Sequence, residues 1–396
     1  MIDDRLSLFD DIQRDFLGPS KYSEPRWQYL NRTARPGYEY LRALLQNWFD
    51  NFVASQSKRE RLCKEFQSDD NKVHLSAFFE LYLYQLFKAQ GFSIEVEPEW
   101  QQGCPDFLLT SSVGAQILVE ATCIFPEWLY GSASQWEKDA LDYLNDNLTI
   151  SDSSLDIKID SFPSGSPPLK QLAREIQARI DEVSHAQEDT RDADVDNQGM
   201  HPMVYTHDTW SIEFGISQSG NPQSGEPKSR AIGSVLKNYG SVDVISLLRS
   251  KIAKKNKQFG ELSVPYILAI NNLDEATELI SNLSMIDALF GDDVTLVYPE
   301  NGISSRKRLQ NGSWYGPDGP RNTRMSGICY FRRLIPINVH TVEPVLWHHP
   351  YSRNPFESNQ FPISQNIPNW VTRVYDRIEG MHPRDLLVVD DSKMPK

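Results

Sequence analysis

The sequence predicts an α/β protein, because helical and strand patterns alternate along it. Residues 73–91 have apolar side chains at helical spacing and close on Gly91, a residue type that often ends a helix. Three segments with strand composition follow: 92–98, 105–110 and 116–122. Farther along, 242–258 predicts a helix and 264–271 predicts an apolar strand suited to a buried position. Together they predict a central mixed sheet flanked by helices.

The predicted organisation has three parts. Residues 1–70 are a helical lead-in, in which 38–50 is amphipathic. Residues 72–298 hold the sheet and are interrupted by a large insertion at about 124–240, which we interpret as an excursion from one core. Residues 299–396 are a β-rich C-terminal extension with basic and aromatic side chains, whose last residues are expected to fray.

Composition predicts a soluble cytoplasmic protein. The four cysteines form no Cys-x-x-Cys pair, so neither a disulfide framework nor a zinc site is expected. The first residues lack a basic segment before an apolar core, which argues against a signal peptide. No apolar run approaches the roughly 20 residues of a membrane span, so no membrane partner is expected.

Asp106 and Glu120 are the strongest candidates for a functional site. If the turn between strands 105–110 and 116–122 centres near Val113, antiparallel pairing sets Asp106 opposite Glu120. Their Cβ atoms would lie about 5 Å apart, where carboxylates repel unless a positive charge lies between them. Carboxylate oxygens suit Mg²⁺, so the pair predicts a magnesium site. The other interpretation is a pair of solvated strand-end carboxylates.

Glu80 adds a third carboxylate. It shares a helical stripe with apolar residues: Val73, Tyr84 and Phe87. A carboxylate on an inward face is costly unless it is paired or bound to metal. Glu80 is therefore expected at the same site, although a glutamate at the margin of an apolar face would give the same pattern.

The order of these segments resembles the PD-(D/E)XK nuclease superfamily. Glu80 matches the glutamate of the first helix, Pro105-Asp106 matches the PD element, and Glu120-Ala121-Thr122 matches (D/E)XK. The wider pattern is similar to a group of bacterial proteins with this domain, on five segments: Leu30–Pro36, Phe79–Leu83, Pro105–Phe107, Val119–Thr122 and Trp347–Pro350. The resemblance is specific over about 72–123, with a second piece near 245–271. One position departs from the superfamily, because Thr122 stands where it has lysine.

The resemblance implies a restriction-endonuclease-like core and a Mg²⁺-dependent endonuclease, a hydrolase of phosphodiester bonds in which Mn²⁺ can substitute. It implies that Asp106, Glu120, the backbone carbonyl of Ala121 and Glu80 bind the metal. DNA is the expected substrate ahead of RNA, in a restriction or phage-defence role. A homo-oligomer is compatible with this interpretation.

The absent motif lysine needs a substitute. Lys251, Lys254 and Lys255 lie on the predicted helix 242–258, and Lys251 and Lys255 share a face because they are four residues apart. We expect Lys255 to serve as the catalytic cation, with Lys251 as the second choice. A solvated basic face is the alternative.

A basic segment at 301–333 contrasts with the net charge of −14, which argues against broad coating of nucleic acid. The expected contacts with the phosphate backbone are Arg321, Arg324, Arg332 and Arg333. Aromatic residues interleaved with the arginines could stack on bases. Solvated surface is the other interpretation of such a run.

Three function classes remain open from the sequence. The first is metal-dependent cleavage of nucleic acid. The second is a catalytically inactive nuclease-like domain that binds nucleic acid or a protein partner, which the threonine at position 122 favours. The third is a structural interaction module with incidental carboxylates. Turnover separates the first from the second, and Mg²⁺ binding separates the third from both.

Overall fold

The computed structural model describes twelve segments of the chain: 6–100, 103–125, 135–150, 153–159, 168–188, 203–207, 210–218, 230–237, 244–273, 282–298, 303–369 and 374–395. The chain divides into two compact units. Unit 1 consists of Met1–Ile12, Pro36–Pro126 and Asp243–Lys396, and unit 2 consists of Gln13–Arg35 and Glu127–Val242. Both units are discontinuous in sequence.

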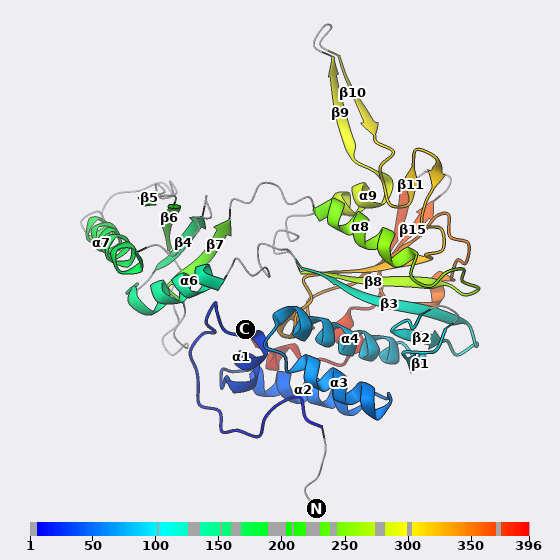
Figure 1. Ribbon diagram of the computed structural model, residues 1–396, viewed down its shortest axis with the longest axis horizontal. Helices are drawn as coiled ribbons and strands as arrows, with labels where there is room; N and C mark the ends of the chain where they lie inside the picture. Colours follow the sequence, from blue (N-terminus) through cyan, green and yellow to red (C-terminus); the bar gives the residue numbers. More distant parts are fainter. Residues whose placement is uncertain are drawn as a thin grey trace, which may run out of the picture. The chain divides into compact units, whose positions relative to one another are not determined.

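Unit 1 is built on an eight-stranded mixed sheet (Figure 1). Its spatial order is β1 (Ser93–Val96), β2 (Phe107–Thr110), β3 (Gln116–Ile124), β8 (Tyr266–Asn272), β13 (Gly327–Arg332), β14 (Val345–His348), β15 (Gln365–Asn369) and β16 (Val374–Ile378). The first three strands are antiparallel neighbours, whereas β3, β8 and β13 are parallel. Every residue of β8 is buried, as expected for a strand covered on both faces.

Four strands after residue 299, β13 to β16, belong to this sheet. β13 pairs with β8 from Gly327↔Ile267 to Arg332↔Asn272, and β14, β15 and β16 continue outward from it. We predicted a separate C-terminal extension; most of its strands instead complete the central sheet. Two small antiparallel pairs lie outside that sheet: β9 (Asp293–Tyr298) with β10 (Ile303–Arg308), and β11 (Tyr315–Gly316) with β12 (Gly319–Pro320).

Helices cover both faces of the sheet (Figure 1). On one face α4 (Asn71–Ala89) lies against the strands, with α2 (Tyr38–Asp50) and α3 (Gln56–Phe66) packed on it. The other face carries α8 (Val244–Asn256) and α9 (Asn282–Phe290). Short helical turns complete the unit: η3 (Pro336–Asn338), η4 (Ser358–Gln360), α10 (Pro383–Leu386) and η5 (Asp391–Lys393).

The sequence sets the limits of α4. The Asp70 side chain accepts a hydrogen bond from the backbone N–H of Lys72 at its start, and Gly91 follows its end with φ at 87°. Because α4 lies between the sheet and other helices, it is buried nearly all round and has no clear polar face.

Unit 2 has a four-stranded sheet in the order β5 (Met203–His207), β6 (Trp210–Gln218), β4 (Ser153–Ile159) and β7 (Ile232–Lys237). Its helices are α1 (Arg26–Arg32), α6 (Gln135–Asn147) and α7 (Leu169–Glu188). Its apolar core is separate from that of unit 1 and includes Leu155, Ile176 and Phe214.

An early segment of the chain belongs to unit 2. We assigned Gln13–Arg35 to the helical lead-in, but Asp142 of α6 accepts hydrogen bonds from the backbone N–H groups of Tyr22 and Ser23, at 2.6 and 3.0 Å. The predicted insertion thus packs with this earlier segment.

The C-terminal segment is ordered against α2, so the expected fraying is wrong for the described residues up to Pro395. Met394 is 3% exposed, and the backbone N–H of Asp390 donates to the Tyr40 hydroxyl at 2.9 Å. Gly37, with φ at 84°, lies so close to Met394 and Pro395 that a Cβ atom would not fit. In the described part of the chain, no helix has the length and apolar character needed to cross a membrane.

Candidate active site

The hairpin of β2 and β3 has the predicted register. Phe107 pairs with Val119 and Thr110 pairs with Gln116, and the same register one residue earlier sets Asp106 against Glu120. Gly114, with φ at 82°, provides the left-handed residue of the turn. Strand pairing therefore places the two carboxylates on neighbouring strands at one end of the hairpin.

Asp106 is bonded by a backbone group rather than by a side-chain cation. Its Oδ2 accepts a hydrogen bond from the backbone N–H of Ala121 at 2.7 Å. Burial raises the pKa of Asp106 to about 7, and the negative charges of Glu120 and Glu80 act in the same direction. The opposing effects of the Ala121 N–H and of Lys58 are smaller. This carboxyl group therefore titrates near neutral pH.

Glu120 is 4% exposed, and it meets a cation from α8. Lys255 Nζ lies 2.5 Å from Glu120 Oε1, and Gln258 Nε2 donates to the same oxygen at 3.2 Å. The other oxygen, Oε2, is buried and has no hydrogen-bond partner among the described residues. A buried carboxylate oxygen without a donor is costly, so Oε2 is available to a ligand.

The two candidate lysines differ in position. Lys255 contacts Glu120, as we expected for the first of the two candidates. Lys251 is half-buried near Cys123; burial lowers its pKa, and Lys255 and Lys254 add to that effect. The structure thus brings Lys255, the first choice, to Glu120.

Glu80 belongs to a neighbouring ion-pair cluster. Lys58 Nζ of α3 lies 2.5 Å from Glu80 Oε1 and 2.8 Å from Glu97 Oε1, and Arg61 also contacts Glu97. Burial raises the pKa of Glu80, and Lys58 opposes that shift. Glu80 therefore acts on Asp106 through its charge while its own carboxylate is held by Lys58.

Sequence reasoning missed three residues of this region. Lys58 is 4% exposed, but it lies on a helix rich in charged residues, where nothing marks it as buried. Gln258 lies three residues after Lys255, a spacing that could have indicated it. The buried Tyr266 hydroxyl donates to the Lys255 carbonyl at 3.4 Å, and its pKa is raised by burial and by the charges of Glu120 and Asp106.

The carboxylate pair fits a divalent cation. Within the described residues, no group of three or more His, Cys, Asp or Glu side chains is arranged to hold a metal ion. Mg²⁺ commonly uses one or two carboxylates, with waters and phosphate oxygens as its other ligands. Asp106 and Glu120 supply two carboxylates on neighbouring strands, and Glu120 Oε2 has no hydrogen-bond partner among the described residues.

The four arginines predicted to bind nucleic acid are divided between the two ends of β13. Arg321 and Arg324 precede the strand, whereas Arg332 ends it and Arg333 follows. Six residues of extended strand span about 20 Å, so the four do not form one patch. Arg324 is paired with Glu261, which also pairs with Arg353.

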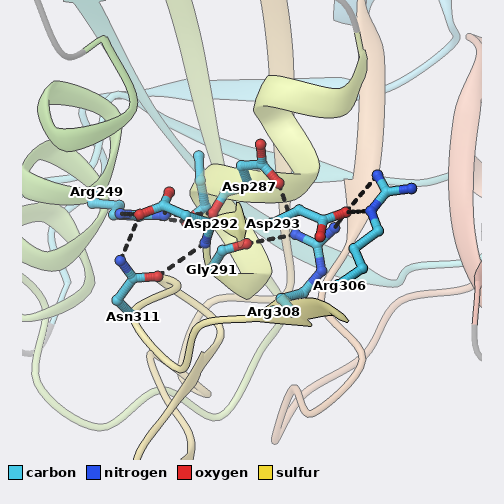
Figure 2. A network of polar contacts seen from close by, with 9 residues as sticks. Arg249, Asp287, Gly291, Asp292, Asp293, Arg306, Arg308 and Asn311 are labelled. Carbon is cyan, nitrogen blue, oxygen red and sulfur yellow. Dashed lines mark hydrogen bonds and ion pairs between the residues drawn. The ribbon is translucent and has the colours of Figure 1, made fainter. Parts of the chain in front are cut away.

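Arg306 and Arg308, which precede these four arginines in the sequence, belong to a network of paired charges (Figure 2). Arg249 of α8 lies 2.6 Å from Asp292 Oδ1, and Asn311 Nδ2 donates to Asp292 Oδ2 at 2.7 Å. Arg308 lies 2.7 Å from Asp287, and Arg306 lies 2.6 Å from Asp293. The Arg249 hydrogen bond lowers the pKa of Asp292. The antiparallel strands β9 and β10 form a two-stranded ribbon, and we call these residues the ribbon base, since they surround the start of β9 and the end of β10.

No protein-family model, no curated protein and no solved structure matches this chain.

Proposed function

We propose that unit 1 is a metal-dependent nuclease that hydrolyses phosphodiester bonds, with a core of the restriction-endonuclease type. The order of elements supports this: α4, then the antiparallel strands β1, β2 and β3, then α8, then β8 parallel to β3. This is the arrangement that the resemblance to PD-(D/E)XK nucleases implies. A role in restriction or phage defence belongs to the same proposal.

The observation that carries the proposal is the contact of Lys255 with Glu120. Thr122 leaves the motif without a cation, and α8 supplies an ammonium group to the carboxylate two residues away. An ammonium has three N–H donors, so a lysine held by Glu120 through one of them can direct another toward water or phosphate.

Each residue then has a defined task. Asp106 and Glu120 would hold a divalent cation such as Mg²⁺ or Mn²⁺, and the Ala121 N–H keeps the Asp106 carboxylate oriented. When bound, the cation supplies polarisation of the phosphate and a lower pKa for water. Lys255 orients the attacking water and offsets negative charge. Glu80, held by Lys58, adds negative potential at Asp106.

A second candidate function is binding of nucleic acid without cleavage. The neutral Thr122, at the position where the superfamily has lysine, favours it. Both candidates require the same surface, and they differ in turnover.

The test is incubation of the purified chain with plasmid DNA and with structured RNA in Mg²⁺, Mn²⁺ or EDTA, beside the Asp106→Asn variant. We expect the wild type to cleave in a metal-dependent way, with a higher rate on DNA than on RNA. The variant should not cleave. Cleavage of equal rate by Asp106→Asn would reject the proposed site. Binding without turnover in any metal would select the second candidate.

A further inference from the structure

The β9–β10 ribbon is a feature that the carboxylate site does not use. Its two strands pair with each other from Asp293↔Arg308 to Val297↔Ser304 and Tyr298↔Ile303, and no third strand among the described residues joins them. Along β10 and beyond it, every residue from Ser304 to Gln310 is exposed. Figure 1 shows the ribbon extending from α9 away from the sheet of unit 1.

The ribbon base holds this ribbon firmly. An isolated pair of strands is marginally stable in water, so anchoring contacts decide whether it keeps its shape. Figure 2 shows Arg249, Asp292 and Asn311 on one side of the base and Asp287, Asp293, Arg306 and Arg308 on the other. Gly291 has φ at 105°, and a Cβ atom there would lie 1.8 Å from the Leu309 carbonyl oxygen, so the chain closes tightly where the ribbon begins.

The exposed strand of the ribbon is cationic on both faces. Arg306 and Lys307 are neighbours on β10, so their side chains point to opposite faces. The Arg306 side chain is 76% exposed, and its ion pair with Asp293 is of the weak, solvent-screened kind that a phosphate can replace. Such a strand in a chain of net charge −14 is complementary to a polyanion.

We propose that the β9–β10 ribbon enters the major groove of B-form DNA and that Arg306 and Lys307 contact the phosphates on its two sides. The proposal rests on the proposed nuclease function and names its substrate. The major groove of B-form DNA admits a two-stranded ribbon, whereas that of an A-form RNA helix is too deep and narrow. The ribbon therefore selects duplex DNA over duplex RNA.

The helix α8 links the ribbon to the carboxylates. Arg249 anchors the ribbon at Asp292, and Lys255 contacts Glu120 on the same helix. Six residues of α-helix span about 9 Å, so one helix holds both the anchor of the ribbon and the lysine at Glu120, about that far apart along its axis.

The test measures binding of the full chain in EDTA by fluorescence anisotropy. The probes are a DNA duplex of about two helical turns, an RNA duplex of the same sequence, and the single DNA strand. Lys307→Glu should weaken duplex DNA binding about tenfold. Lys307→Ala should flatten the dependence of log K on log salt by about 0.9 for the lost contact. Asp293→Asn removes the acid beside Arg306 and should tighten binding several-fold.

Two control variants make the same changes of charge at other positions in unit 1. Lys64→Glu on α3 and Glu39→Gln on α2 alter exposed residues and should leave affinity within about twofold of the wild type. A shortened ribbon, with Leu296–Ser305 replaced by Asn-Gly, keeps the Thr295↔Arg306 pair and should lose duplex affinity as Lys307→Glu does. Circular dichroism checks that each variant folds.

The outcomes separate the two proposals. Equal affinity and salt slope in the ribbon and control variants would overturn the ribbon proposal, even if cleavage depends on Asp106. Tighter binding of duplex RNA than of duplex DNA would overturn it as well. If DNA binding depends on the ribbon but the wild type does not cleave, the ribbon proposal is supported and the proposed nuclease function is rejected.

Discussion

The carboxylate pair of the hairpin and the ribbon base both receive a cation from α8, yet their charges are matched differently. At the ribbon base, arginines pair with Asp287, Asp292 and Asp293. At the hairpin, Asp106 is bonded by a backbone N–H, and Glu120 has one lysine and one oxygen without a donor among the described residues.

The pKa shifts record that difference. The Arg249 hydrogen bond lowers the pKa of Asp292, whereas burial raises the pKa of Asp106 to about 7. Matched charges on a surface stabilise a structure modestly, but a buried carboxylate that lacks a side-chain cation is a cost that a ligand can relieve. The comparison therefore separates carboxylates that arginines neutralise from carboxylates whose cost a ligand can still relieve.

The largest expected effect is the loss of either hairpin carboxylate. Removing a metal ligand costs several kcal/mol of transition-state stabilisation, so Asp106→Ala and Glu120→Ala should each lower cleavage by ~10³-fold or more. Single-turnover cleavage assays measure this. The control is Glu213→Ala in unit 2, whose carboxylate is matched by Lys158 at 2.6 Å. An equal loss in the control variant would remove the distinction between matched and unmatched carboxylates.

The next effect is that of the lysine. Lys255→Met should lower the cleavage rate by ~10²-fold, the range of a lost acid–base or orienting group, with metal affinity nearly unchanged. Lys254→Met, an exposed neighbour on α8, is the control and should cleave normally. Lys251→Met should have a smaller effect than Lys255→Met. If Lys255→Met cleaves at the wild-type rate, the cation is supplied by another residue.

A stability effect should follow from the raised pKa of Asp106. Between about pH 4 and pH 7 the folded state binds more protons than the unfolded state, so stability falls as pH rises through this window. Asp106→Asn removes that dependence. At pH 8 in EDTA, removing the buried charge should raise the free energy of unfolding by about 1 kcal/mol and the melting temperature by about 2–4 °C. At pH 4 the variant and the wild type should have nearly the same melting temperature.

Thermal unfolding followed by circular dichroism, with and without Mg²⁺, provides the measurement. Mg²⁺ should stabilise the wild type at pH 8 and leave Asp106→Asn nearly unaffected, because a ligand stabilises the state that it binds. The same melting temperature for both proteins at every pH would mean that Asp106 carries no excess cost.

The smallest effect should come from the ribbon base. Arg249→Met removes contacts to Asp292 and to the Asp287 and Ala288 carbonyls, and should lower the free energy of unfolding by about 1 kcal/mol. The pKa of Asp292 is lowered, so its contribution is present above the ordinary carboxyl pKa and is lost as pH falls through the folded value. The difference in free energy of unfolding between Arg249→Met and the wild type, measured by urea titration, should therefore not change between pH 5 and pH 9. A slope in that range would contradict the comparison.

The sequence was sufficient to predict the hairpin register and the lysine. Strand alternation has a period of two, so the turn at Gly114 determined which residue faces Glu120. Helical spacing places Lys251 and Lys255 on one face of α8, and the resemblance to PD-(D/E)XK nucleases suggested that this helix lies beside the hairpin. The register depends on local periodicity, which a sequence displays directly, whereas the choice of a lysine on α8 depended on the resemblance as well.

Other features depended on contacts between distant segments. No local pattern indicates that Gln13–Arg35 packs with α6, or that Lys58 is drawn into the interior by Glu80 and Glu97. Arg324 and Arg333 are separated because β13, a largely buried strand, lies between them. Composition alone indicated one continuous basic segment there. The docked C-terminal segment likewise needs Tyr40 and Gly37, which lie at the other end of the chain.

The parallel pairing of β3 with β8 has a consequence for how the molecule folds. Leu118 meets Tyr266 only after the whole of unit 2 has been made, so this contact closes a long loop at an entropic cost and slows folding. Until α8 and β8 arrive, β3 is an open sheet edge and Glu120 has neither Lys255 nor Gln258 beside it. A nascent chain therefore lacks the assembled site until most of its length has been synthesised.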